Sequence, residues 1–205
     1  MDTRIGFGYD SHAFKPGVPL RIGGLAFDHP EGLAGHSDGD VLLHALTDAL
    51  LGSVAAGDIG SFFPPGDPRW KDADSAIFLS LALEELQHAG YQLVNADVTL
   101  ILAAPKIGPV AGEMRARVAD LLGVDLDQVS IKAKTPEGLN LDHVAQCHAV
   151  VLVERLAEDD ELKSMSAVIE SQRQLEDVVD DLLASVHGVP KKRPERPVFD
   201  TDDIT

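Results

Sequence analysis

Segments with the patterns of strands and helices alternate along the first 157 residues, and this alternation limits the possible folds more than any other feature. Strand-like runs occur at residues 3–8 and 19–27, which glycines interrupt, and again at 91–103, 128–134 and 144–156. Strands that alternate with helices of one-sided apolar character are typical of a layered α/β or α+β domain. We therefore predict a single domain of this class over residues 1–157.

Three helices are expected between these strands. The first begins near Asp38, because apolar side chains then recur at helical spacing, at Val41, Leu42, Ala45, Leu46, Ala49 and Leu50. The second is expected to be capped by Ser75 and to end at the HAG sequence of residues 88–90. The third spans residues 109–123 and stops at a glycine.

Residues 158–205 differ in character from this domain. Apolar and amide side chains recur there at alternating spacings of four and three residues, at Val168, Gln172, Leu175, Val179, Leu182 and Val186. We predict a helical extension over residues 158–188, which could pack on its own domain or join chains together. Residues 189–205 have too few apolar side chains to fold, so we predict a disordered tail.

The chain carries a net charge of −17, which excludes a general nucleic-acid or anionic-membrane binder because such proteins need a basic surface. A phosphorylated ligand could still be bound by a metal, a helix N-terminus or a few lysines. Cys147 is the single cysteine, so no disulfide can form within the chain. No run approaches the roughly 18 apolar residues of a membrane span. We expect a soluble, cytoplasmic protein.

Asp10 and His12 form the first candidate metal site. They lie two residues apart just after a predicted strand, and in an extended segment such side chains point the same way. A carboxylate and an imidazole suit Zn²⁺ or a similar divalent ion, and a third ligand with an open fourth position would make the site catalytic. The alternative is a turn aspartate beside a surface histidine.

The stretch HSDGDVLLH, residues 36–44, holds the next candidates. Three short polar side chains could each cap the helix that follows: Ser37, Asp38 and Asp40. His44 lies one turn inside, on or beside the buried stripe, where it could be a packed core residue or a metal ligand. Asp48 is one turn further, the place for a carboxylate that orients a metal-bound imidazole. His36 precedes the helix, so we expect the two histidines to have different roles.

Three loops could contact a phosphorylated ligand. GDIGSFFPPGD, residues 57–67, could cover a ligand or only connect elements. In LAAPKIGP, Lys106 and the following helix N-terminus could face a phosphate. In KAKTPEGL, Lys134, Thr135 and Glu137 could serve a phosphate and its metal, or cap a turn. None of these three sequences identifies a ligand site by itself.

Taken in order, these motifs resemble the 2-C-methyl-D-erythritol 2,4-cyclodiphosphate synthase family. The resemblance runs from about residue 3 to residue 155 and rests on GYDSHAF, LAGHSDGDVLLHALTDALLG, GDIGSFFPPGDP, DADS, ADVTLILAAPKI and IKAKTPEGL. The Asp-x-His element followed by HSDGDxxxH is its most specific part. The resemblance implies a mixed β-sheet covered by helices on one face, in a homotrimer whose active sites lie between neighbouring chains.

The resemblance also implies a role for each matching residue. The zinc ligands would be Asp10, His12 and His44, of which the first two also face the substrate. The methylerythritol phosphate part would contact His36, Ser37, Asp58, Ile59 and Gly60, and the loop of Phe63, Pro64, Pro65, Gly66 and Asp67. The cytidine nucleotide would lie against Ala104, Pro105, Lys106, Ile107, Lys134 and Thr135. Glu137 would bind a second metal, Mg²⁺ or Mn²⁺, that bridges the α- and β-phosphates.

The implied activity is that of a phosphorus–oxygen lyase of the non-mevalonate isoprenoid pathway. The 2-phosphate of 4-diphosphocytidyl-2-C-methyl-D-erythritol 2-phosphate attacks the β-phosphorus, and CMP leaves as the ring closes. Both partners are anions, so cations that neutralise them lower the main obstacle. His36 and Thr135 would steady the attacking and transferring groups. Because the attack is intramolecular, positioning can supply much of the acceleration.

This chain departs from the family pattern at two places. Many members have threonine where this chain has Lys134. Many also carry FTGRGEG where it has NLDH, and no arginine occurs between residues 118 and 154. That arginine contributes to a central trimer cavity in much of the family, so the resemblance does not extend isoprenoid diphosphate binding to this chain. Plant-type members share KAKT and lack the arginine stretch. The alternative function is a metal- and nucleotide-binding trimer without turnover.

Overall fold

A five-stranded sheet is the largest element of the computed structural model, which describes residues 2–156. The strands lie in the order β4-β1-β7-β5-β6. They are β1 (Thr3–Pro16), β4 (Glu31–Leu33), β5 (Tyr91–Ile101), β6 (Val129–Lys134) and β7 (Val144–Arg155). Only β5 and β6 pair in parallel, and the other neighbours are antiparallel. The described sheet is therefore mixed, as predicted.

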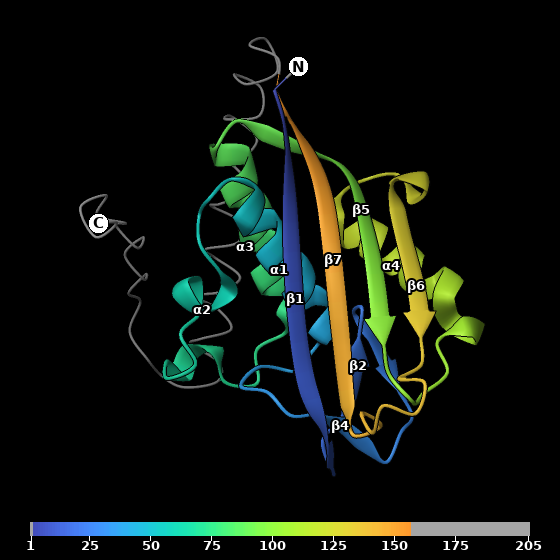
Figure 1. Ribbon diagram of the computed structural model, residues 1–205. Helices are drawn as coiled ribbons and strands as arrows, with labels where there is room; N and C mark the ends of the chain where they lie inside the picture. The colour runs from blue at the N-terminus through green and yellow to red at the C-terminus, as the bar shows by residue number, and fades with distance from the viewer. Residues whose placement is uncertain (1, 157–205) are drawn as a thin grey trace.

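Helices cover one face of this sheet (Figure 1). The three longer ones are α1 (Val41–Ser53), α3 (Ser75–His88) and α4 (Ala111–Leu122). The shorter elements are α2 (Ile59–Phe62), the 3-10 turns η1 (Pro68–Trp70), η2 (Gly108–Val110) and η3 (Leu126–Gln128), and a separate hairpin of β2 (Leu20–Ile22) and β3 (Leu25–Phe27). Aliphatic side chains fill the space between helices and sheet. This confirms the predicted single α+β domain with helices on one face.

Several boundaries differ from the sequence prediction. β1 continues to Pro16 instead of ending at residue 8, because its polar second half pairs with β7 and β4 along the sheet. Residues 19–27 are divided into the β2–β3 hairpin by Gly23 and Gly24, which have φ of 62° and 74°. β4 was not predicted, since three residues give no periodic signal.

Helix α1 is capped by Asp40, one of the three candidates. Its Oδ1 accepts hydrogen bonds from the backbone N–H groups of Leu42 and Leu43, at 3.1 Å each. The same carboxylate accepts from Gly23 N (2.9 Å) and Gly24 N (2.7 Å). Burial raises the pKa of Asp40, and these N–H donors oppose that effect. Asp40 therefore ties the β2–β3 turn to the start of α1, and this bond fixes the helix that carries His44.

Helix α1 packs directly on the backbone of β1 at two glycines. A Cβ atom on Gly6 would lie 1.8 Å from the carbonyl oxygen of Ala49, and one on Gly8 would lie 1.9 Å from that of Ala45. No side chain can occupy such a space without moving the helix. These glycines bring α1 close enough for His44 to reach the side chains that follow Gly8 on β1.

Gly8→Ala is expected to lower the free energy of unfolding by about 3 kcal/mol, because the added methyl group must push α1 away from β1. Gly52→Ala is the matched control. A Cβ there would meet only the Phe7 carbonyl oxygen, at 3.9 Å, and alanine favours a helix over glycine by about 0.5–1 kcal/mol. Urea unfolding of both variants measures the difference. Equal midpoints for the two would contradict this account of the contact.

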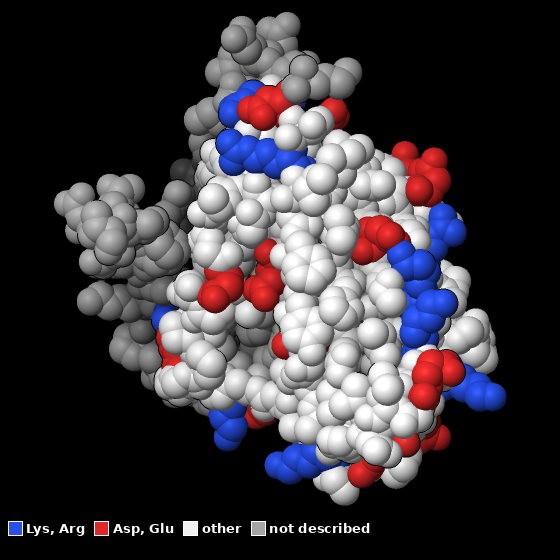
Figure 2. Space-filling view, viewed as in Figure 1, with Lys and Arg blue, Asp and Glu red and all other residues white. Residues whose placement is uncertain are grey.

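Among residues 2–156, no helix covers the opposite face of the sheet along β1 and β7 (Figure 1 and Figure 2). Large apolar side chains project from it and remain exposed, by 71% at Ile5, 60% at Phe7, 43% at Tyr9 and 41% at Val150. In Figure 2 this central band is uncharged, and acidic and basic side chains lie around it. A continuous exposed apolar stripe marks a surface that another molecule covers.

Two predictions fall outside residues 2–156. The helical extension over residues 158–188 and the disordered tail over residues 189–205 lie outside the described residues. Within the described part, no helix combines the length and apolarity needed to cross a bilayer.

Candidate metal centre and active site

Asp10, His12 and His44 converge on one point at the junction of β1 and α1. Asp10 Oδ2 lies 2.9 Å from His12 Nε2 and 2.9 Å from His44 Nδ1. The two histidine nitrogens are 3.0 Å apart. One ligand atom from each residue thus forms a nearly equilateral triangle, and these three side chains are a group that could hold a metal ion.

The two-residue repeat of strand β1 and its close contact with α1 explain this convergence. Gly6, Gly8, Asp10 and His12 follow one another at intervals of two, so all four lie on the helix-covered face of β1. Gly8 admits α1 at the level of Ala45, and the neighbouring His44 therefore lies beside Asp10. The predicted shared direction of Asp10 and His12 is present in the structure.

Electrostatics favour the ionised carboxylate in this cluster. Burial acts to raise the pKa of Asp10, but hydrogen bonds from His12 and His44 outweigh it and hold that pKa well below its usual value. This favours the ionised form of Asp10, which is the form that can bind a metal.

The donor set fits a divalent metal of the zinc type. Two imidazole nitrogens and one carboxylate oxygen are common ligands of catalytic zinc, which keeps a fourth position open. A tetrahedral zinc with bonds of about 2.0–2.1 Å has ligand atoms about 3.3 Å apart. The distances of 2.9–3.0 Å between these ligand atoms are within about 0.4 Å of that value. His44 is nearly buried, and Asp10 and His12 are partly exposed, so the cluster is open on one side.

The far side of the His44 ring contacts two serine hydroxyls. Its Nε2 lies 3.0 Å from Ser37 Oγ and 2.8 Å from Ser75 Oγ. Ser37 is a predicted substrate contact, whereas Ser75 was expected only to cap α3. Asp74 caps that helix instead, by accepting from Ala76 N at 2.9 Å. Ser75 is therefore a site residue that the sequence prediction missed.

His36 lies beside the predicted substrate loop. Its Nε2 is 3.2 Å from the carbonyl oxygen of Asp67, and because a carbonyl only accepts, this nitrogen carries a proton. The backbone of His36 also accepts from Asp72 N at 2.8 Å. These contacts join residues 36–38 to the loop that precedes α3.

The loop of residues 63–67 is held by aromatic packing. Phe63 is buried against Trp70 and stacks on Phe78 with ring centroids 4.4 Å apart. Phe78 in turn lies 6.0 Å from the ring of His44. The rest of the loop lies outside this aromatic cluster. Pro64, Pro65 and Gly66 are exposed, and Asp67 forms an ion pair with Arg69. Hydrogen bonds from Arg69 lower the pKa of Asp67.

Asp58, Ile59 and Gly60 begin the short helix α2. Asp58 caps it by accepting from Ser61, and these hydrogen bonds lower its pKa. Asp48 Oδ1 accepts from the N–H group of Ile59 at 2.8 Å. Asp48 thus holds the loop of residues 58–60, and its hydrogen bond goes to this loop and not to the imidazole of His44.

The residues expected on the nucleotide side lie at the other edge of the sheet. Ser11, Gln146, Ile101 and Lys134 occupy one row across β1, β7, β5 and β6. Three strand spacings therefore separate Lys134 from the metal cluster, or about 14 Å. On the loop after β6, Thr135 Oγ1 donates to Glu137 Oε1, and Glu137 has a left-handed φ of 50°.

The second predicted nucleotide segment follows the neighbouring strand β5. It comprises Ala104, Pro105, Lys106 and Ile107, of which Ile107 is buried in the core and Lys106 is exposed. Because β5 and β6 are parallel, their following loops emerge at the same end of the sheet. The structure therefore groups the two predicted nucleotide segments with each other, and it separates them from Asp10, His12 and His44 of the same chain.

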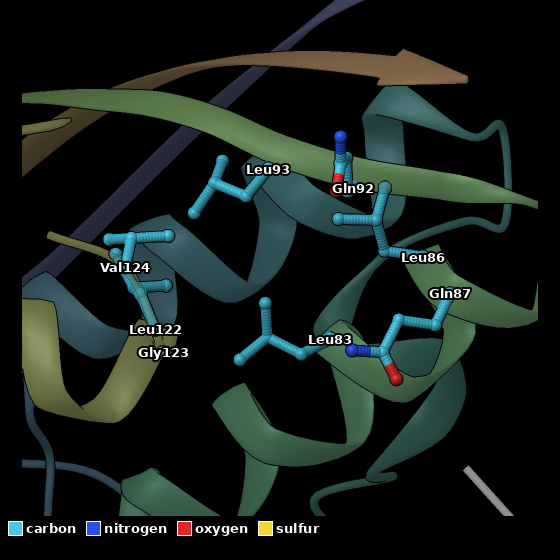
Figure 3. Close-up of a pocket in the computed structure, with 8 residues that line it drawn as sticks. All are labelled: Leu83, Leu86, Gln87, Gln92, Leu93, Leu122, Gly123 and Val124. Carbon is cyan, nitrogen blue, oxygen red and sulfur yellow. The ribbon is translucent and has the colours of Figure 1, made fainter. Parts of the chain in front are cut away.

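A small cavity of about 180 Å³ lies elsewhere, between α3, β5 and the end of α4 (Figure 3). Leu83, Leu93 and Val124 supply apolar walls, and Gln87 and Gln92 are its polar members. None of the residues that line it is ionisable. It offers no acid, base or metal ligand, so the Asp10 cluster is the stronger candidate for an active site.

Known proteins resemble this chain over most of its described part. A family model described as the YgbB family matches residues 3–154. The 2-C-methyl-D-erythritol 2,4-cyclodiphosphate synthase of Koribacter versatilis is 60% identical over 152 residues, which are 74% of this chain and 98% of that protein. A solved structure of a synthase of this name has a TM-score of 0.70 at 43% identity, covering 74% of this chain and 100% of its own. A CDP-bound form gives 0.70 at 41% identity, with the same coverage.

Proposed function

The chain belongs to the YgbB family of 2-C-methyl-D-erythritol 2,4-cyclodiphosphate synthases, and we propose that it closes the cyclodiphosphate ring at the Asp10–His12–His44 cluster. Its activity is the cyclodiphosphate-forming step of isoprenoid biosynthesis, in which CMP is released, and the enzyme is a lyase. The convergence of the three ligand atoms to within 3.0 Å of one another carries the proposal about where the chemistry occurs.

Zinc is the metal that we propose for this cluster. The donor set of two imidazoles and one ionised carboxylate supports it, as does the open side of the cluster. Zinc bound there would act as a Lewis acid that neutralises charge on a phosphate oxygen of the substrate. Asp10 and His12 would then also border the position of that phosphate.

His36 and Ser37 are proposed to bind the methylerythritol phosphate part, with the loops of residues 58–60 and 63–67. Because Nε2 of His36 donates to the Asp67 carbonyl, the orientation of the ring is fixed. Nδ1 of a neutral His36 can accept from a substrate hydroxyl, and in the protonated ring it can donate to the attacking phosphate. His36 therefore has the donors and acceptors that its proposed role in positioning the 2-phosphate requires.

Lys134, Thr135 and Glu137 are proposed to bind the nucleotide diphosphate, together with residues 104–107. The loop offers an ammonium group, a hydroxyl and a carboxylate within four residues, and all three side chains are exposed. Oxygen ligands of this kind suit Mg²⁺ or Mn²⁺, so Glu137 is our candidate ligand for the second metal. The left-handed backbone of Glu137 supports a functional role, because strained conformations gather at ligand sites.

A homotrimer is the assembly that we propose. The exposed stripe of Ile5, Phe7, Tyr9 and Val150 supports it, because burial in an interface would stabilise these apolar side chains. The offset of about 14 Å between the metal cluster and Lys134 also supports it. A neighbouring chain can bring its own Thr135 and Glu137 to the open side of the zinc cluster, which one chain alone does not do.

A cytoplasmic location and the absence of nucleic-acid or membrane partners remain part of the proposal. Cys147 is free and buried, and burial raises the pKa of its thiol. A single unpaired cysteine is common in reducing compartments. The net charge of −17 supports a small-molecule substrate over a polyanionic partner.

The proposed function is tested by adding the cytidine substrate to the purified protein and measuring metal content and CMP in parallel. We expect one zinc ion per chain, and one CMP released for each cyclodiphosphate formed. Removal of zinc with a chelator should stop CMP release, and added Zn²⁺ should restore it, because the Lewis acid is required. Binding of CDP without CMP release would instead indicate a nucleotide-binding trimer that lacks turnover.

A further inference from the structure

Ser75, the first residue of α3, connects His44 to Asp38. It is fully buried, and its Oγ lies 2.8 Å from His44 Nε2. The same hydroxyl donates to Asp38 Oδ1 at 2.5 Å, and the backbone N–H of Ser75 donates to Asp38 Oδ2 at 3.3 Å. The proposed function gives neither Ser75 nor Asp38 a role.

The directions of these hydrogen bonds follow from the available protons. A serine hydroxyl has one proton, and an ionised carboxylate can only accept. Since the Ser75 proton goes to Asp38, its oxygen must accept from His44. Nε2 of His44 therefore carries the proton. The other nitrogen, Nδ1, faces Asp10 and His12, so a metal that binds there takes the place of any Nδ1 proton while the Nε2 proton stays on the Ser75 side.

We propose that Asp38 and Ser75 form a positioning relay that holds His44 as a metal ligand. The relay fixes both the rotation of the imidazole and the tautomer in which Nδ1 can bind the metal. Partners of this kind, which hydrogen-bond the far side of a ligating histidine, typically contribute 10–100-fold to metal affinity. The inference rests on the proposed zinc site, and it adds two positioning residues to it.

Ser37 differs from Ser75 although its hydroxyl reaches the same nitrogen, at 3.0 Å. Its other contacts are long, at 3.5 Å to Ser75 Oγ and 3.4 Å from Gly39 N. No carboxylate fixes the direction of its proton. The Ser37 hydroxyl can thus turn toward a substrate, whereas the Ser75 hydroxyl is held by Asp38, and the two serines have separate roles.

Ser75→Ala is the variant that tests the relay, and Ser53→Ala is its control. Ser53 is a buried serine of α1 whose hydroxyl donates to the carbonyl oxygen of Leu50 at 2.7 Å, so its removal deletes a similar internal hydrogen bond away from the metal cluster. The zinc Kd of each full-length protein is measured by competition with a chromophoric chelator. The thermal midpoints of the metal-free forms are measured in parallel.

We expect Ser75→Ala to raise the zinc Kd about 10–100-fold, and Ser53→Ala to change it less than about twofold. Asp38→Asn keeps an acceptor oxygen but removes the charge, so it should raise the Kd by less than Ser75→Ala does. In metal-free protein labelled with ¹⁵N-histidine, the His44 nitrogen shifts should report protonation at Nε2 in the wild type. Ser75→Ala should lose that preference.

An unchanged zinc Kd in Ser75→Ala, or an equal rise in Ser53→Ala, would overturn the relay while leaving the proposed function intact. A metal-free wild-type His44 that lacks a proton at Nε2 would overturn it as well. If Ser75→Ala does not fold, the Asp38→Asn affinity and the wild-type nitrogen shifts decide the question. A wild-type protein that binds no zinc would overturn both the relay and the proposed metal centre, so the two failures are distinguishable.

Discussion

His44→Ala is expected to abolish zinc binding and to lower the rate of CMP release by about 10³–10⁴-fold. The substitution removes one of three protein ligands, and it also removes the group that Ser75 and Asp38 orient. Loss of a Lewis acid removes several kcal/mol of transition-state stabilisation, and each 1.4 kcal/mol corresponds to a factor of ten in rate. Metal analysis and a CMP-release assay on the same sample measure both losses.

Two controls separate loss of the metal from loss of the fold. His88→Ala removes a histidine at the other end of α3, about 20 Å along the helix from Ser75, and should leave zinc content and rate unchanged. Chelated wild-type protein should recover when Zn²⁺ is added, whereas His44→Ala should not. If His44→Ala kept wild-type turnover without bound zinc, the metal-assisted reaction would have to be abandoned.

Local periods made Asp10, His12 and His44 candidates in the sequence, and the resemblance to the family joined them into one predicted zinc site. Asp10 and His12 share a face of β1 through the period of two, and His44 follows the cap of α1 by one turn. The side of β1 to which they point was not accessible, because it depends on Gly6 and Gly8. A glycine in a strand does not indicate which face is buried. The contact of these two positions with the Ala45 and Ala49 carbonyls becomes visible only when α1 is packed on β1.

Contacts between distant segments account for most of what the sequence did not reveal. Ser75 lies 31 residues from His44, and its role depends on how the start of α3 docks beside α1. Asp48 has the helical spacing that would suit a partner of His44, yet its hydrogen bond goes to Ile59. The position of the α2 loop therefore decides the partner of Asp48. Helical spacing sets which side chains are neighbours on α1, and tertiary packing chooses the partner.

The residues predicted to bind the nucleotide lie far from the metal cluster of the same chain. Lys134 shares a cross-strand row with Ser11, which is next to Asp10, but two whole strands lie between them. In the proposed homotrimer, a site that uses both groups draws them from different chains whose sheets meet at the uncovered face. If the site is shared between chains, two inactive variants can complement each other in one trimer. A site within one chain could not be restored in this way.

Co-assembly of His44→Ala chains with Glu137→Gln chains is expected to restore activity that neither variant has alone. In a cyclic trimer each site would take its zinc ligands from one chain and its Glu137 from the neighbour. Random assembly of equal amounts then makes about a quarter of the sites wild type. Purification through two different tags keeps only mixed trimers, in which about a third of the sites are wild type. We therefore expect about a third of the wild-type CMP-release rate from them, against about 1% or less for either homotrimer.

The matched control for this experiment is co-assembly of His44→Ala with His12→Ala. Every chain in that mixture lacks one zinc ligand, so no arrangement of chains creates an intact site, and activity should stay at the level of the single variants. Sites built within one chain would give no recovery in either mixture, because each chain carries its own defect. Recovery in the first mixture alone therefore identifies a site shared across the interface, and its absence from assembled trimers would assign all these residues to one chain.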